Sequence, residues 1–525
     1  MPASEPPQHL RRAPGRDGSH GVPNRRRLVS NFAALSLAEM ACRAVSVAVT
    51  LNLAKRLGAA GYGRIEFSFN LVCWLVLLVR EGMDVIAARE IARHPRLVRP
   101  FANQVTALRL VIATTLWCLL AIASFWLMPG ATERIILLTY GLLLITTSVG
   151  LDFVYRGLER MGIVAVSMCI RTATYAICVA LLVFDSGRIT WVPALLVFGE
   201  SFGIALVWVI YTRQYGLPRP SLRGGRFLRV FVQRGRTIYL IQVSQAAIVA
   251  MSIVVVGLRC GWHDVGVYSA SHRMVAAVLT FGLIFQQVAF PSLARSWRAS
   301  PEAGRAALNG FVRVLTLVFI PIAVGTCALS GLFVHVLLGD SYSQASRLLS
   351  IEIWRAPLLS IAFLYQSALI ALNRESVGVR VLVVGALGSM PVLSLMLHFF
   401  GLNGVAIGSV AIAFALMAAG FERLRWDNRH PAWHHQLGQP LIAAMVMLIP
   451  CLALQSVGLL ASVVSGAVTY VLVLFALGGL RVADLKPLFA QSSPQQQARH
   501  IPPPHGVEQD GRPRTSVVGS SDLGR

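Results

Sequence analysis

The sequence predicts an all-α membrane protein that crosses the bilayer about fourteen times. Of its 525 residues, 55% are hydrophobic and only 13% are charged, whereas a soluble protein carries about 25% charged residues. The apolar residues also fall in blocks of about 20, the length that a helix needs to cross a hydrocarbon core of ~30 Å. A transmembrane β-barrel would show shorter segments of alternating polarity instead.

Fourteen apolar segments lie between two polar tails. The tails at 1–28 and 488–525 are rich in Pro, Gly and either Arg or Ser and Gln, and the first lacks the apolar core of a signal peptide. Both are therefore predicted to be disordered and cytoplasmic. The predicted spans are approximately 29–53, 64–88, 104–127, 134–156, 162–184, 190–212, 237–258, 265–292, 310–337, 345–372, 377–399, 402–422, 437–456 and 459–480.

Positive charge alternates from one loop to the next and predicts the orientation. Most arginines lie in one set of loops, while the other set is short and poor in arginine, apart from the first loop with Lys55, Arg56 and Arg64. By the positive-inside rule the arginine-rich loops and both termini are cytoplasmic. Because the net charge of +24 is distributed between apolar blocks, it indicates membrane topology and not nucleic-acid binding.

The longest internal loop, 213–236, is basic and follows the sixth span. It divides the chain into six spans at 29–212, six at 237–425 and a final pair at 437–480. Prolines and glycines within this loop support a break at this point.

A weak internal repeat supports the same division. Gly63, in Ala-Gly-Tyr-Gly after the first span, aligns with Gly266, in Val-Gly-Val-Tyr after the seventh, at an offset of 203. Gly157-Leu-Glu-Arg160, after the fourth span, matches Ala371-Leu-Asn-Arg374, after the tenth, at an offset of 214. The two matches predict two six-helix halves in the same orientation, an arrangement typical of transporters.

The segment Asp152-Phe-Val-Tyr-Arg-Gly-Leu-Glu-Arg-Met161 resembles the one that follows the fourth helix of Wzx-type polysaccharide flippases, in the MOP transporter superfamily. That family commonly has the pattern D-W-x-x-x-G-x-E-x-M, in which Phe153 here replaces the tryptophan, and Asp152, Gly157 and Glu159 match it. Looser matches in the expected order are Leu57–Gly63, Gly82–Arg93, Gly266–Ala270, Phe290–Ala294 and Leu337–Tyr342.

The resemblance covers about 30 to 425. It implies two six-helix lobes in a MATE-like arrangement that move undecaprenyl-pyrophosphate-linked oligosaccharides across the bacterial inner membrane by alternating access. It implies a role in the biosynthesis of O-antigen, capsule or exopolysaccharide, with a polymerase and chain-length or export proteins as further partners. It implies no enzymatic activity. The eight cysteines show no spacing of a metal site or a disulfide framework, and no cofactor is expected.

Ionisable residues inside spans are costly in a membrane and are therefore the candidate site residues. Glu39 and Arg43 are four residues apart on one face of span one. They form either a structural pair or a site in which Arg43 contacts pyrophosphate. Arg171 in span five and Glu200 in span six form either a bridge or a site in which Arg171 reaches the lumen.

Two further arginines belong to the second half. Arg273, beside His272 in span eight, is predicted to contact an anion, with snorkelling to the outer surface as the alternative. Arg355 in span ten, with Glu352 three residues before it, is a further candidate lumen cation with its supporting carboxylate.

Charged residues near the inner ends of spans have two interpretations. Arg80 and Asp84 are predicted to form either a cytoplasmic gate or an interfacial network. Arg109 is explained by positive-inside anchoring. Asp152 and Glu159 are expected to pair with arginines of their own segment, which makes this segment a corner at the cytoplasmic membrane edge.

Two other functions compete with flipping. A MATE-like drug or cation antiporter needs a net acidic, aromatic site, whereas arginines outnumber carboxylates at mid-depth here. A membrane-embedded polysaccharide polymerase needs a substantial external loop, and the predicted external loops have only about 5–12 residues. The sequence therefore favours the flippase.

Overall fold

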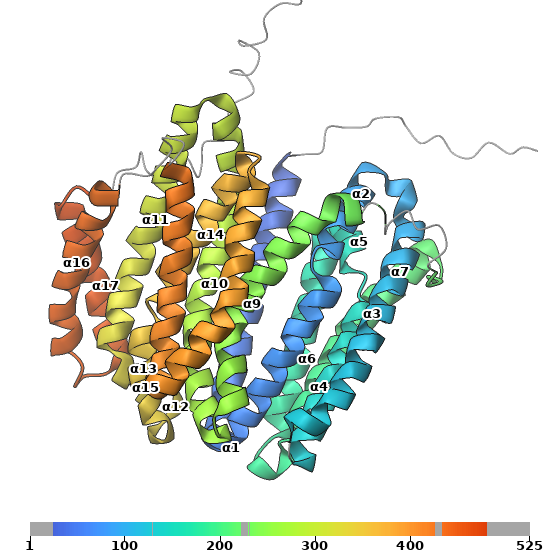
Figure 1. Cartoon of the computed structure of the whole chain (residues 1–525), viewed down its shortest axis with the longest axis horizontal. Helices are drawn as coiled ribbons and strands as arrows, with labels where there is room; N and C mark the ends of the chain where they lie inside the picture. The colour runs from blue at the N-terminus through green and yellow to red at the C-terminus, as the bar shows by residue number, and fades with distance from the viewer. Residues whose placement is uncertain (1–24, 129, 222–228, 230, 426–432, 480–525) are drawn as a thin grey trace, which may run out of the picture.

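The computed structural model describes residues 25–128, 130–221, 229, 231–425 and 433–479, and these residues contain helices but no strand (Figure 1). Ten helices are long and apolar enough to cross a membrane. The predicted all-α multi-pass architecture is confirmed. The number fourteen stays a prediction, because α1 (Arg25–Arg80) is not among the ten and α15 (Glu375–Arg425) counts once although it contains two helices. Of the predicted tails, only 25–28 belong to the described residues, and 1–24 and 488–525 lie outside them.

The first half of the chain begins with α1, which consists of two helices that follow one another directly and meet at a break. Gly58 has φ 66° and ψ 174° inside α1, a conformation that glycine adopts without strain. We name the segments before and after it α1a and α1b, and they correspond to the first two predicted spans. Since α1 begins at Arg25, the last four residues of the predicted tail are helical. The helices are α1 (Arg25–Arg80), α2 (Met83–Arg93), α3 (Val98–Leu127), α4 (Ala131–Ser148), α5 (Asp152–Gly157), α6 (Met161–Leu182) and α7 (Trp191–Tyr215), with 3-10 turns η1 (Pro95–Leu97) and η2 (Ser186–Arg188).

The second half contains two breaks that the sequence did not predict. The predicted spans 310–337 and 345–372 are each divided, at Leu329 and at Ile353–Trp354. Gly401, with φ 60°, separates the two helices inside α15. The helices are α9 (Arg236–Arg259), α10 (Trp262–Ala299), α11 (Pro301–Ala328), α12 (Ser330–Leu338), α13 (Ser343–Glu352), α14 (Arg355–Ala371), α15 (Glu375–Arg425), α16 (Trp433–Ala453) and α17 (Leu459–Ala476), with a π turn η3 (Phe231–Gly235) and a 3-10 turn η4 (Asp340–Tyr342).

The bundle has two unlike ends. Helices α2 and α5 lie at the top of Figure 1, together with the exit points of both chain termini, whereas α12 and the break within α1 lie at the bottom. The connections from α2 to α3 and from α5 to α6, which belong to the arginine-rich set, lie at this top end. We call this end the basic end and the other the opposite end.

The two halves of the chain meet at the opposite end, at the glycines that the repeat aligns. A Cβ atom on Gly63 would lie 2.0 Å from the carbonyl oxygen of Trp262, and one on Gly266 would lie 1.9 Å from that of Ala59. The starts of α1b and α10 are therefore in direct backbone contact. The hydroxyl of Tyr342 adds a hydrogen bond of 2.9 Å to the carbonyl of Ala54, which further closes this end.

The second repeat match has the same backbone in both copies. Glu159 and Asn373 both have φ 58°, and they are the only non-glycine residues of the described chain with positive φ. The amide of the next residue, Arg160 or Arg374, donates to a carbonyl five residues earlier, at 2.9 Å in each case. This geometry ends helices in a left-handed turn. The repeat thus corresponds to equivalent corners of the two halves.

The last two helices attach to the second half through α11. Ala443, Ala444 and Met447 of α16 are buried in one cluster with Ile320 and Val324 of α11. The hydroxyl of Tyr470 in α17 donates to the carbonyl of Leu317 at 2.8 Å. In Figure 1 this pair forms the red edge of the bundle, far from the blue and teal helices of the first half.

Candidate functional site

A cavity of about 360 Å³ lies among α1, α4, α6, α7 and α10. Three tyrosines and the hydroxyls of Ser46 and Thr50 contribute to its walls. Its charged lining residues are Arg80, Arg171, Arg273, Glu66 and Glu200. The cavity therefore brings together Arg171 and Arg273, which are two of the four arginines predicted as substrate contacts. Arg80 of the predicted gate and the predicted carboxylate Glu200 line it as well.

Arg171 lies at the middle of α6 and is held by two carboxylates. Its Nη2 is 2.8 Å from Asp152 Oδ2 and its Nη1 is 3.3 Å from Glu200 Oε2, while Nε has no hydrogen-bond partner in the described chain. Gly203 of α7 allows this close approach, because a Cβ there would lie 2.2 Å from Arg171 Cγ. The bridge to Glu200 is present, and the guanidinium lines the cavity as well, so the two interpretations of this pair do not exclude each other.

Asp152 differs from the expectation for its segment. It is 4% exposed and bonds Arg171 instead of an arginine of its own segment. The helix α4 ends at Ser148, and the short break before α5 turns the carboxylate into the bundle. A sequence pattern does not reveal this, because the break depends on packing. Glu159 is exposed at the left-handed turn.

Gly157, the second residue of the family signature, has a steric role. A Cβ on Gly157 would lie 2.7 Å from the carbonyl oxygen of Ala88 in α2. Only glycine permits α5 to lie this close to the α2 backbone. The close approach keeps α5, and with it Asp152, folded back against the bundle.

The predicted gate forms a buried charge network at the basic end of the cavity. Arg80 is 3.2 Å from Asp84 and 3.6 Å from Asp152. Arg109 also binds Asp84, is 0% exposed, and lies over the ring of Phe153 at 5.2 Å. Positive-inside anchoring at the surface is therefore the wrong interpretation of Arg109. Arg80 and Asp84 thus belong to a charge network, as one of the two interpretations expected. The role of this network as a gate stays a prediction.

Arg273 reaches across from the second half into the first. Its Nη2 is 2.5 Å from Glu66 Oε1 of α1b, and its guanidinium lies over the ring of Phe69 at 5.6 Å. The amide of Asn70 donates to the other oxygen of Glu66 at 2.9 Å. Glu66 was not singled out in the sequence, although its place one turn inside a predicted span is the signal that could have found it.

Arg43 lies beside the cavity and not in its wall. It forms the predicted pair with Glu39 at 2.9 Å, with side chains 50% and 32% exposed, and it approaches Thr280 of α10 at 3.4 Å. Positions 43, 46 and 50 share one helix face, and Ser46 and Thr50 line the cavity. Arg43 therefore lies one turn from the cavity, toward the basic end.

Arg355 belongs to a separate buried network in the second half. It is 2% exposed, and its guanidinium binds Glu352 at 3.2 Å and the carbonyls of Ile248 and Val249 at 2.7 and 3.0 Å. Glu352 also accepts a contact of 2.8 Å from His272. The structure thus places Arg355 and Glu352 in the core that joins α9, α10, α13 and α14. They do not line the cavity, and a role in substrate contact is not supported by this geometry.

We expect Arg355→Met to destabilise the fold by about 3–5 kcal/mol, because it leaves the fully buried Glu352 without its guanidinium partner. The double variant Arg355→Met with Glu352→Leu removes both charges and should recover part of that loss. Thermal unfolding in detergent compares the two with the wild type. A single variant as stable as the wild type would contradict a structural role for this network.

Residues 28–297 match the model of the family described as polysaccharide biosynthesis protein. This match covers half of the chain. The chain belongs to the polysaccharide biosynthesis protein family. The matched region extends from the first turn of α1 to the last turn of α10 and includes every charged residue that lines the cavity.

A curated relative agrees with this assignment over part of its length. The chain is similar to the probable low-salt glycan biosynthesis flippase Agl15 of Haloferax volcanii, with 21% identity over 215 residues. The match covers 41% of this chain and 44% of the relative, so it spans less than half of that protein.

Solved structures share the fold. The lipid II flippase MurJ, in an inward closed conformation, superposes with a TM-score of 0.64 at 13% identity, covering 85% of this chain and 99% of that chain. An inward-facing multidrug resistance MATE transporter of the MOP superfamily superposes with a TM-score of 0.59 at 14% identity, covering 76% and 97%. The protein is thus a multi-pass membrane protein that shares the fold of these two transporters. The named relatives are flippases and transporters and not enzymes.

Proposed function

We propose that this protein flips an undecaprenyl-pyrophosphate-linked oligosaccharide across the bacterial inner membrane for cell-surface polysaccharide biosynthesis. The observation that carries the proposal is the cavity lined by Arg80, Arg171 and Arg273 against two carboxylates. Charged groups at membrane depth are costly and mark substrate pathways. An excess of guanidinium groups suits a pyrophosphate, which accepts charge-assisted hydrogen bonds from arginine.

Carboxylates offset the charge of two of these guanidinium groups. Glu66 binds Arg273, and Asp152 and Glu200 bind Arg171. A pyrophosphate competes with them for the same donors. The exposed Arg43, one turn nearer the basic end, is suited to make the first contact with the head group before it enters.

The arrangement of the halves supports alternating access. The opposite end is closed by the backbone contact at Gly63 and Gly266, and the basic end is the cytoplasmic one by the positive-inside rule. Closure of the opposite end is what we expect of a state that exchanges substrate with the cytoplasmic leaflet. The lobes at 29–212 and 237–425, linked by 213–236, would rock about this contact, with 437–480 attached to the second lobe. Glycan polymerase and export proteins are the expected partners that receive the product.

The proposal is tested with purified protein in liposomes that contain a fluorescent prenyl-pyrophosphate disaccharide. We expect the protein to make the inner-leaflet pool accessible to an external quencher, at a rate well above that of protein-free liposomes. Liposomes that contain the protein but show no more exchange than the protein-free ones would contradict the function.

The second candidate is a MATE-like cation antiporter, which the shared fold favours. The charges of the cavity argue against it, because a cation would meet three arginines. A polysaccharide polymerase is less well supported still, since the predicted external loops are short.

A further inference from the structure

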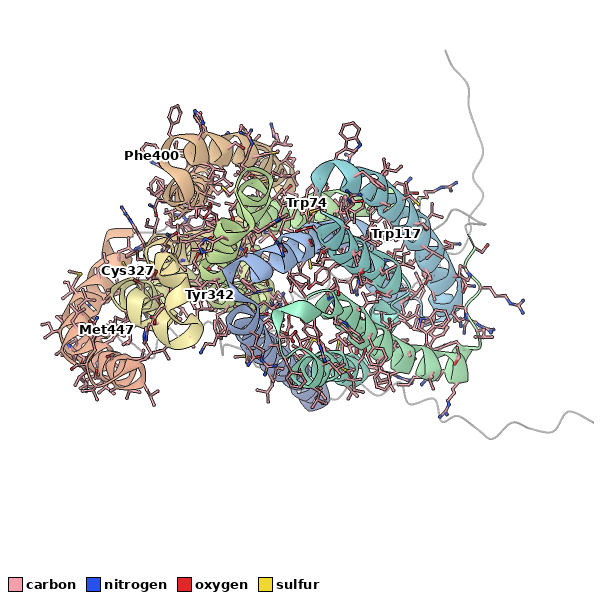
Figure 2. All side chains as sticks on the ribbon, turned by 90° about the horizontal axis from the view of Figure 1, so that it is seen from below. Trp74, Trp117, Cys327, Tyr342, Phe400 and Met447 are labelled. Atoms are coloured by element: carbon pink, nitrogen blue, oxygen red, sulfur yellow. The ribbon has the colours of Figure 1, made fainter. Side chains whose placement is uncertain are left out.

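A second, larger cavity lies between the two halves of the chain. It has a volume of about 730 Å³, and its walls come from α1b, α9, α10 and α14. Figure 2 labels Trp74, one of its lining residues, where the blue helix of the first half adjoins the green helices of the second. We call it the amide cleft, because its polar side chains are Asn70, Gln242, Gln245, Gln286, Gln287 and Ser367.

Two hydrogen-bonding groups of residues that line the amide cleft have no partner among the described residues. The amide nitrogen of Gln286 donates to the carbonyl of Phe363 at 3.0 Å and to Ser367 Oγ at 2.9 Å. Its amide oxygen has no partner in the part of the chain that the structure describes. The indole nitrogen of Trp74 is buried and also lacks a partner there, although a buried polar group without one is unusual. The amide oxygen of Gln286, a residue that lines the cleft, is available to a ligand.

The charge of the amide cleft differs from that of the arginine cavity. No arginine, lysine or histidine is among its described lining residues, and its one charged residue is Glu81. Gln242 donates to Glu81 at 2.9 Å. A ligand with a carboxylate would therefore lie near a like charge, with no basic side chain to neutralise it, and burial without a partner is strongly unfavourable.

The two cavities are neighbours on either side of α1b. Cys73 lines both, while Glu66 and Arg80 face the arginine cavity and Trp74 and Glu81 face the amide cleft. One helix thus separates a compartment lined by three arginines from a polar one whose one charged lining residue is Glu81. A lipid-linked sugar has the same division, between its pyrophosphate and its glycan.

We propose that the amide cleft binds the glycan part of the substrate and selects uncharged sugars over sugars that carry a carboxylate. This inference depends on the proposed function. Amide side chains donate and accept hydrogen bonds, as sugar hydroxyl and N-acetyl groups do. The aromatic ring of Trp74, which lines the cleft, offers an apolar face to the sugar ring. The volume lies within the range of small-ligand sites. Gln245 and Gln286, on adjacent helices, are the specificity-determining residues.

Binding of three probes to the full-length protein in nanodiscs tests the inference. The probes are geranyl pyrophosphate, its conjugate with N-acetylglucosamine and its conjugate with glucuronic acid. We expect the neutral conjugate to bind about 10-fold more tightly than geranyl pyrophosphate, from one or two net hydrogen bonds. The acidic conjugate should bind no more tightly than geranyl pyrophosphate.

A charge introduced into the cleft should reverse the preference. Gln245→Lys supplies the missing counter-charge and should tighten binding of the acidic conjugate about 10-fold. Gln344→Lys makes the same change at an exposed position of α13, outside the cleft, and should leave all three affinities unchanged. The affinity for geranyl pyrophosphate itself should not respond to Gln245→Lys.

The outcomes separate this inference from the proposed function. If geranyl pyrophosphate binds but the two conjugates bind equally, the selectivity of the cleft is overturned while the pyrophosphate site stands. If Gln245→Lys and Gln344→Lys act alike, the assignment of Gln245 is overturned. If none of the probes binds, the proposed function itself is contradicted.

Discussion

Replacing Arg171 or Arg273 by alanine is expected to reduce flipping of a prenyl-pyrophosphate sugar by about 10- to 100-fold. Each guanidinium contributes hydrogen bonds to a charged group, which are worth about 1.5–3 kcal/mol, and 1.4 kcal/mol corresponds to a factor of ten. Both side chains line the same cavity although they come from different halves of the chain. The measurement is the initial rate of flipping in liposomes.

Two further variants distinguish substrate contact from a general loss of structure. Arg171→Lys keeps the charge but cannot bridge two acceptors in the same fork geometry, so it should recover only part of the rate. Arg298→Ala removes an exposed arginine of α10 outside the cavity and should flip at the wild-type rate. Thermal unfolding confirms that each variant is folded. Equal rates for Arg171→Ala and Arg298→Ala would contradict the assignment of the cavity.

Gly266→Ala is expected to shift the protein away from the conformation described here. The added Cβ would lie 1.9 Å from the carbonyl oxygen of Ala59, and backbone cannot move aside as a flexible side chain can. Overpacking of this kind opposes the packed state by about 1–3 kcal/mol, a population shift of about 5- to 150-fold. The opposite end should therefore open, and the flipping cycle should slow because return to this state is disfavoured.

Spin labels at Phe184 and Val336 report this change, since both residues are exposed and lie at the opposite end, in different halves. With the eight native cysteines replaced, the distance between the labels should lengthen in Gly266→Ala. Gly388→Ala is the matched control, because a Cβ there meets nothing within 4 Å. An unchanged distance in Gly266→Ala would show that this contact does not hold the end closed.

The sequence predicted the fold class and the cationic candidates because both depend on local composition. Arg171 and Arg273 are recognisable as charges inside apolar spans, and both line the cavity. Arg355 has the same signature but lies in a buried network. Composition does not distinguish the two cases, because the difference lies in which helices surround the side chain.

The carboxylates that bind these arginines were harder to predict than the arginines themselves. Arg273 binds Glu66, 207 residues away in the sequence, and Asp152 reaches Arg171 only because α4 ends before it. The amide cleft also depends on tertiary structure, since its glutamines come from two helices. By contrast, the corner at Glu159 and its copy at Asn373 were found from the repeat, because a left-handed turn depends on local sequence.

The most direct test of the account compares two substrates in the same proteoliposomes. One is a fluorescent prenyl-pyrophosphate disaccharide, and the other is a fluorescent organic cation of the kind that drug antiporters carry. A cavity in which arginines outnumber carboxylates predicts flipping of the anionic lipid and no transport of the cation above that of protein-free liposomes. Transport of the cation, with the lipid left in its original leaflet, would contradict the account.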